Sequence, residues 1–163
     1  MSAGTRREYD ITAFGATGQD RTGDGRPLTR EIQAAIDACR DAGGGTVVVP
    51  PGVFVTGSIV LGSNVELYLS PGAVLAGSPD PSEYPVIESR YGGYVGFNMV
   101  SEAGSTARPS SEAHRPLIYA DGATDVSISG GGTIDGRGEP WWNMKREKRL
   151  VRARPCLVSF NNC

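Results

Sequence analysis

The sequence is poor in the residue types that build disulfide-rich and metal-binding proteins. Among its 163 residues there are three cysteines, Cys39, Cys156 and Cys163, and one histidine, His114. Three widely spaced cysteines do not make a disulfide framework, and no Cys-x-x-Cys pair or Cys/His ligand spacing is present. We therefore interpret the cysteines as buried or incidental thiols and His114 as a loop residue. No metal site and no cofactor are expected.

Long apolar runs and an excess of one charge are also lacking. No stretch approaches the ~20 apolar residues of a membrane span, and the N-terminal segment MSAGTRREYDITAFGA lacks the apolar centre of a signal peptide. The net charge of -2 gives no overall attraction for nucleic acid. We expect a cytoplasmic protein without nucleic-acid, membrane or obligate protein partners, with an extracellular or periplasmic location as the alternative.

Glycine and proline, by contrast, are abundant, with 23 and 11 residues spread along the chain as turn signals. One helix is predicted over roughly 30–42, with Thr29 as its N-cap and Gly43 as the residue that ends it. Its apolar positions form one buried stripe: Ile32, Ala35, Ile36 and Cys39. Residues 9–14 are predicted to form a short strand before it.

After this helix the chain is a train of short apolar runs separated by turn signals, which indicates an all-β fold. The runs are 46–49, 53–60, 65–69, 73–76, 117–120, 126–129, 133–135 and 157–160. Two segments echo each other, RPLIYADGATDV from Arg115 and RPCLVSFNNC from Arg154. A loose repeat of short strands with variable loops is typical of a solenoid, and a right-handed parallel β-helix fits best.

Three consecutive glycines, 43–45, stand beside the first of these strands and raise the question of a nucleotide site. A dinucleotide-binding glycine motif follows a strand and opens a helix, because the helix N-terminus holds the phosphates. Here the helix comes before the glycines and the strand after them. The glycines are therefore interpreted as the end of a helix and the turn into the first coil.

Taken together, several segments resemble the polygalacturonase family of glycoside hydrolases (family 28), within the pectate-lyase-like β-helix superfamily. They are YDITAFGATG, the run from EIQAAIDACRDAGGG to GAVLAGS, PLIYADGATDVSISGGGTIDGRGEPWW, and RPCLVSFNNC. The resemblance implies a right-handed, single-stranded parallel β-helix (pectin-lyase-like) whose N-terminal end is capped by the helix. It places the chain in the N-terminal portion of that family: 1–8 as a disordered N-terminus and 9–163 as the start of one β-helix domain, with coils from residue 46 onward.

The resemblance also implies an activity, hydrolysis of α-linked galacturonan with inversion. The family's catalytic motifs, Asn-Thr-Asp, Asp-Asp, His-Gly and Arg-Ile-Lys, are all absent from these 163 residues. We therefore expect no catalytic residue in this chain and no hydrolysis by the chain alone. Two alternatives remain open: a non-catalytic β-helix module of the tailspike or adhesin kind, and a calcium-dependent pectate lyase.

Few side chains remain as candidates for a site. Trp141 and Trp142 are candidate substrate-binding residues, since aromatic faces suit sugar rings, although they are as well suited to sealing a core. Asp135 is interpreted as a turn-capping residue between glycines. The run KREKRLVRAR, residues 145–154, is interpreted as a solvated loop or short helix, with attraction of a polyanionic glycan as the functional alternative. Asp20 and Asp24 lack the spacing of a calcium loop.

Overall fold

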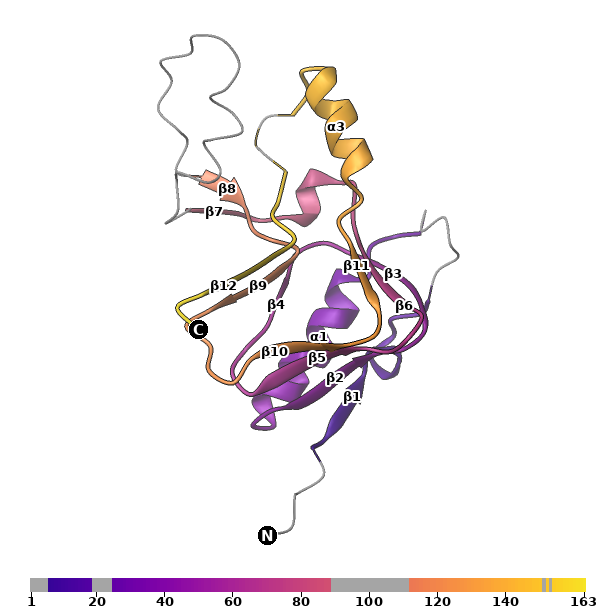
Figure 1. Cartoon of the computed structure of the whole chain (residues 1–163), viewed down its shortest axis with the longest axis vertical. Coiled ribbons are helices and arrows are strands. Elements are labelled where there is room, and N and C mark those ends of the chain that lie inside the picture. Colours follow the sequence, from indigo (N-terminus) through magenta and orange to yellow (C-terminus); the bar gives the residue numbers. More distant parts are fainter. Residues whose placement is uncertain (1–5, 19–24, 89–111, 151, 153) are drawn as a thin grey trace.

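The computed structural model of the chain describes residues 6–18, 25–88, 112–150, 152 and 154–163. Three sheets of short parallel strands surround one apolar core (Figure 1). Sheet A contains β1 (Glu8–Asp10), β2 (Gly45–Val49), β5 (Val65–Leu69) and β10 (Ser127–Gly130). Sheet B contains β3 (Gly52–Thr56), β6 (Ala73–Gly77) and β11 (Thr133–Asp135). Sheet C contains β4 (Ile59–Val60), β9 (Ile118–Asp121) and β12 (Val158–Asn161).

After α1 the chain passes through sheets A, B and C in that order three times, and each complete round forms one coil. Every strand pair within these sheets is parallel and joins one coil to the next. This is the parallel β-helix that the sequence predicts, and the predicted fold class is confirmed. An antiparallel pair, β7 (Val86–Glu88) with β8 (Glu112–His114), lies outside the coils. Within the described residues, no helix is long and apolar enough to cross a membrane.

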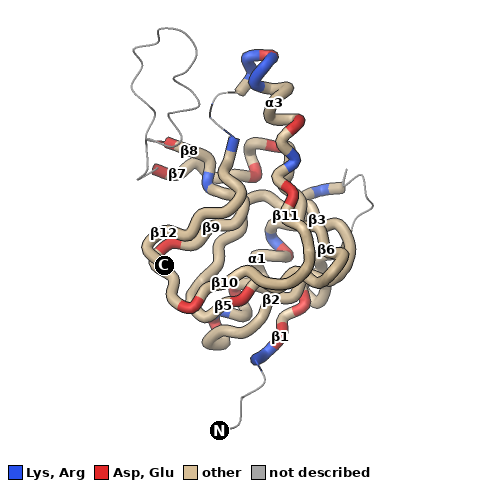
Figure 2. Tube along the Cα trace, viewed as in Figure 1, with Lys and Arg blue, Asp and Glu red and all other residues tan. Residues whose placement is uncertain are grey.

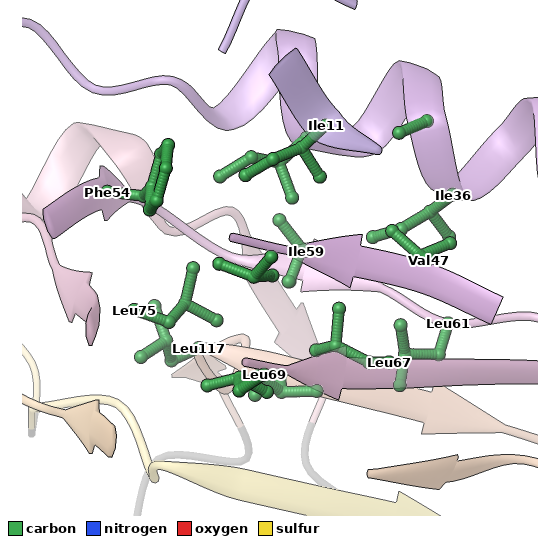
Figure 3. Packing of buried hydrophobic residues seen from close by; sticks show 14 of the residues in the cluster. Ile11, Ile36, Val47, Phe54, Ile59, Leu61, Leu67, Leu69, Leu75 and Leu117 are labelled. Carbon is green, nitrogen blue, oxygen red and sulfur yellow. The ribbon is translucent and has the colours of Figure 1, made fainter. Parts of the chain in front are cut away.

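The helix α1 (Thr29–Asp41) covers the N-terminal end of the coils. Its predicted stripe, Ile32, Ala35, Ile36 and Cys39, is fully buried and belongs to the same core cluster as the inward side chains of the strands. Figure 3 shows Ile36 of this stripe meeting Val47 of β2 between the helix and the strands of the first two coils. Burial of this stripe, together with that of the inward Val, Ile and Leu residues, stabilises both the cap and the first coil.

The helix ends at the glycines as predicted. The N–H groups of Gly43 and Gly44 donate to the carbonyl oxygens of Arg40 and Cys39, both at 2.9 Å. This pair of bonds is a Schellman motif, and it needs the left-handed backbone that Gly43 adopts at φ +92°. The glycine cluster is therefore a helix terminus and a turn, not a phosphate cradle.

The start of the helix differs from the prediction. Thr29 is its first residue rather than its N-cap, and the cap residue Leu28 makes no side-chain capping bond. The hydroxyl of Thr29 instead accepts a hydrogen bond from the N–H of Gly57 at 2.8 Å and donates to the carboxylate of Glu83 at 2.7 Å. The threonine thus ties the helix to the corner between β3 and β4.

The N-terminal strand also differs from the prediction of 9–14. It starts one residue earlier, at Glu8, and ends four residues earlier, at Asp10. Residues 1–5 lie outside the described part, but Glu8 already pairs with Thr46 in β1, so the predicted disorder of 1–8 is wrong at that residue. The strand stops at Asp10, whose side chain accepts from the N–H of Thr12 at 2.8 Å and starts a 3-10 turn, Ile11–Phe14. Such local side-chain bonds compete with extended backbone.

The two echoing segments lie in neighbouring coils, where β9 and β12 pair in sheet C. Ile118 pairs with Val158, so the structural offset is 40 residues, one more than the echo of Arg115 and Arg154 suggests. The N–H groups of Leu117 and Ile118 both donate to the later coil, to the carbonyl oxygens of Cys156 and Leu157, each at 3.0 Å. The shift matters because a one-residue slip exchanges the inner and outer faces.

Candidate functional site

Both long excursions from the coils leave at the same corner, between sheet B and sheet C. In the first coil this corner is only Gly57 and Ser58. In the second it holds the 3-10 turn η2 (Pro81–Glu83) and the β7–β8 pair, and in the third it holds α3 (Gly138–Arg146). Figure 1 shows these elements together on one side of the coils. Insertions gathered on one face of a solenoid are often the binding face, so this corner is the candidate site.

The excursions are joined by three aromatic rings in edge-to-face contact. Trp141 of α3 lies 5.5 Å from Tyr84 and 5.7 Å from His114, between ring centroids, at interplanar angles of 77° and 68°. Tyr84 and His114 are 6.4 Å apart at 72°. Edge-to-face pairs at these separations are attractive beyond the area they bury. The three rings hold the third coil's helix against the second coil's insertion.

Hydrogen bonds fix the two rings of the second coil. The hydroxyl of Tyr84 donates to the carbonyl of Ser78 at 3.0 Å, and burial raises the pKa of the phenol above its ordinary value. The Nδ1 atom of His114 lies 3.0 Å from the carbonyl oxygen of Tyr84. Since a carbonyl only accepts, Nδ1 carries the proton. His114 thus belongs to strand β8 and is half-buried, rather than lying in a loop as predicted.

The two candidate tryptophans have opposite surroundings. Trp141 is 2% exposed and packs in the core, so its ring face is not open to a sugar and the structural alternative is favoured for it. Trp142 is 51% exposed. Lys145 Nζ lies 5.7 Å from its ring centroid and Arg154 Cζ lies 5.0 Å from it. Both cations lie over the indole ring, and Trp142 remains a candidate for binding.

The remaining sequence candidates are accounted for locally. Asp135 accepts a hydrogen bond from the N–H of Arg137 at 2.9 Å, which is the turn-capping role predicted for it. Asp20 and Asp24 lie outside the described residues. Where the structure describes the chain, no group of His, Cys, Asp and Glu side chains has the arrangement of a metal site.

The basic run begins in the last turn of α3 and continues along the surface beyond it. Figure 2 shows its positive charges gathered at the end of that helix. Two of its arginines pair with carboxylates, Arg149 with Glu147 and Arg152 with Glu112, the latter at 2.8 Å. The prediction of a solvated loop or short helix is confirmed for its described residues.

All three cysteines are free thiols, as predicted. Cys39 lies on the buried face of α1, and this burial raises the pKa of its thiol, whereas Cys156 and Cys163 are exposed. A thiol with a raised pKa is a weak nucleophile, so Cys39 serves packing.

Sequence and structure comparisons find polygalacturonases among the proteins that are similar to this chain. No family model matches the chain. It is 34% identical over 143 residues to a probable polygalacturonase of Vitis vinifera, covering 85% of this chain and 27% of that protein. It is 38% identical over 159 residues to the exo-poly-alpha-D-galacturonosidase of Dickeya chrysanthemi, covering 94% of this chain and 23% of that protein.

Among solved structures, a hyperthermoactive exopolygalacturonase from Thermotoga maritima superposes with a TM-score of 0.68. It is 28% identical and matches 96% of this chain and 39% of its own. The chain thus spans about a quarter of the length of the two curated relatives and less than half of this structure.

Proposed function

We propose that the protein carrying this chain, which resembles the N-terminal portion of family 28 polygalacturonases, is a glycoside hydrolase that cleaves α-linked galacturonan with inversion. The observation that carries the proposal is the match of 94% of the chain to a galacturonosidase, together with a fold match to an exopolygalacturonase over 96% of the chain. Its substrate is a pectin-type polysaccharide or its oligosaccharides.

Inverting hydrolysis needs two groups: a carboxylic acid that protonates the leaving oxygen, and a carboxylate that activates a water molecule on the opposite face of the sugar. The motifs that supply these groups in the family are absent from the 163 residues. We therefore assign this chain a supporting role: it provides the N-terminal cap, the first three coils and the insertions at the corner between sheets B and C. Catalytic carboxylates are expected from other coils of the same protein.

The test is an assay of reducing ends released from polygalacturonate, run on the full-length protein and on the 163-residue polypeptide. The full-length protein should release reducing ends, and the first product should have the inverted anomeric configuration by NMR. The 163-residue polypeptide should release none. A product with a new double bond, absorbing in the ultraviolet, would instead indicate a lyase, and no product from the full-length protein would favour a non-catalytic β-helix module.

A further inference from the structure

The ring of Trp142 is presented to solvent by its buried neighbour. Successive residues of a helix point about 100° apart, so the anchoring of Trp141 between Tyr84 and His114 directs Trp142 away from the core. Trp141 is 2% exposed and Trp142 51%. An indole left half exposed on a helix whose roll is fixed in this way is a rigid platform, since little conformational freedom remains to be lost when a ligand stacks on it.

Two cations lie over the ring of this platform, and they come from different parts of the chain. Lys145 is three residues after Trp142, which puts both side chains on one face of α3. Arg154 arrives from the returning segment before β12 and lies 5.0 Å from the ring centroid. Gly138 leaves the space for it: a Cβ at that position would be 3.3 Å from a guanidinium nitrogen of Arg154 and 3.7 Å from the indole.

The charges of these two cations are not used by ion pairs within the described residues. The ion pairs of the basic run involve Arg149 and Arg152, and none in the described part of the chain involves Lys145 or Arg154. Glu139, one turn before Trp142 on the same face, is the single carboxylate within α3. The platform therefore carries a local excess of positive charge, which suits an anionic ligand.

The combination selects a particular chemistry. An aromatic face stacks on the apolar face of a pyranose ring, and a guanidinium beside it donates paired hydrogen bonds to a carboxylate. A uronic-acid unit carries both features on one ring. Single-stranded nucleic acid would use a series of aromatic rings along a basic groove, whereas α3 exposes one ring.

We propose that Trp142, Lys145 and Arg154 form a binding subsite for one uronate unit of an acidic polysaccharide. Trp142 stacks on the sugar ring, and Arg154 and Lys145 bind its carboxylate. The choice of a uronate polymer rests on the proposed function, which this subsite deepens: it would make the corner between sheets B and C a surface that holds anionic but not neutral glycan.

Affinity electrophoresis of the full-length protein tests this directly, with polygalacturonate in one gel and neutral galactan in another. The protein should be retarded in the gel that contains polygalacturonate and should migrate normally in the gel that contains neutral galactan. Trp142→Ala should weaken this retardation roughly tenfold, and the double variant Lys145→Gln/Arg154→Gln by a similar factor, in line with hydrogen bonds to charged groups. Trp142→Phe, which keeps an aromatic ring, should retain most of the binding. Glu139→Gln, which removes the neighbouring negative charge, should strengthen it.

Lys148→Gln is the matched control, because it removes one positive charge from the same run, whereas the cations that lie over the ring in the described part of the chain are Lys145 and Arg154. It should leave retardation within about twofold, as for a surface charge. Unchanged binding in Trp142→Ala, equal loss in Lys148→Gln, or equal retardation by neutral galactan would each overturn the proposal. So would tighter binding of single-stranded DNA that depends on Trp142.

The activity assay separates this proposal from the proposed function. If the subsite is wrong but the function is right, Trp142→Ala binds polygalacturonate like the wild type and the wild type still releases reducing ends. If the function is wrong but the subsite is right, no reducing ends appear and the Trp142-dependent retardation persists.

Discussion

At the scale of single residues, Trp141 and Trp142 show how position decides what a side chain can do. The sequence makes both rings equal candidates for burial and for sugar binding. Tyr84 and His114 decide between them, because their rings receive Trp141 and leave Trp142 outside. These partners come from another coil, and local sequence patterns do not predict contacts between residues of different coils. The role of Trp142 therefore became a specific hypothesis only with the structure.

Tyr84 should make the protein sensitive to alkaline pH. Burial raises the pKa of its phenol above the ordinary value of 10, so the folded state holds the proton where the unfolded chain releases it. Its contribution is complete below about pH 10 and is lost as the pH rises beyond that value. Tyr84→Phe should lower the free energy of unfolding at pH 7 by roughly 1–3 kcal/mol, since the buried carbonyl of Ser78 loses its donor.

Urea denaturation of wild type and Tyr84→Phe between pH 7 and pH 11 checks this. The difference in free energy of unfolding between the two proteins should narrow as the pH rises above 10, because only the wild type has the Tyr84 phenol, whose deprotonation destabilises the folded state. A gap that stays constant to pH 11 would show that the buried hydroxyl does not contribute to the alkaline response.

Glu66 should act in the opposite direction, at acid pH. Its pKa is lowered chiefly by the hydroxyl of Ser129, with help from Thr46 and Arg6 and against the cost of burial. A lowered pKa gives stability that is present above the ordinary value of 4.5 and is lost as the pH falls below it. Glu66→Gln should cost roughly 1–2 kcal/mol at pH 7.

The measurement is the free energy of unfolding between pH 6 and pH 3. It should fall less steeply with decreasing pH in Glu66→Gln than in the wild type. Arg6→Gln is the useful comparison. The Arg6 side chain is 56% exposed in its ion pair with Glu66, so its removal should cost no more than about 1 kcal/mol. An equal cost for both variants would mean that the ion pair, rather than the bond from Ser129, dominates.

At the scale of elements, the corners that lead into the strands of sheet A repeat one backbone solution. A residue with positive φ stands one or two positions before β2, β5 and β10: Gly44 at φ +114°, Asn64 at +61° and Asp125 at +53°. Glycine, asparagine and aspartate are the residues that reach this region at least cost. The turn signals GGG, GSN and DGATD in the sequence are therefore these corners, which is why the strands between them were predictable to within about one residue.

Other elements were less predictable, for reasons that lie outside their own residues. The predicted strand over 53–60 is two strands, β3 and β4, because Gly57 and Ser58 turn the corner between sheets B and C. A Cβ at Gly57 would lie 2.3 Å from the carbonyl oxygen of Glu83, so this corner is shaped by the insertion of the next coil. The pairing of β12 with β9 likewise differs by one residue from the alignment of the two similar segments, because the register is set by contacts between two coils.

The inward ladder of sheet C offers a matched pair of substitutions. Ile59, Ile118 and Val158 stack in register, with Ile118 fully buried between its neighbours and Val158 40% exposed at the last coil. Ile118→Ala should lower the free energy of unfolding by about 2–5 kcal/mol, since it leaves a cavity inside the stack. Val158→Ala, in the same ladder and in the 163-residue polypeptide, should cost less than about 1 kcal/mol.

Chemical denaturation of the two variants, measured side by side at a concentration low enough to keep the polypeptide monomeric, distinguishes a stacked core from a set of independent strands. The two costs should differ by several fold. Similar costs in the monomer would mean that Val158 is as well packed as Ile118 and that the last coil is not open in that polypeptide.

At the scale of the whole molecule, the two ends of the described coils are unlike. At one end α1 buries its apolar stripe against the first coil. At the other, Leu157, Val158 and Phe160 are 41%, 40% and 38% exposed on the last described coil. A solenoid repeat buries its apolar face by stacking on neighbours, and an uncovered terminal repeat lowers solubility. One end is thus built as a cap and the other as a surface on which a further coil can stack.

This asymmetry predicts how the 163-residue polypeptide behaves when it is produced alone. Val158 and Phe160 pair in register with Ile118 and Ala120 and are the exposed members of this ladder, and the strands of the last described coil offer backbone groups at the sheet edges, so the polypeptide should self-associate through this end. Val158→Lys with Phe160→Glu should raise the monomer fraction in sedimentation velocity at equal concentration without changing the far-ultraviolet circular dichroism. Val86→Lys, which charges another exposed apolar residue at 44% exposure, should leave the monomer fraction as in the wild type. Equal monomer fractions for all three polypeptides would place the association elsewhere, and the last coil would then be stable with its apolar side chains in water.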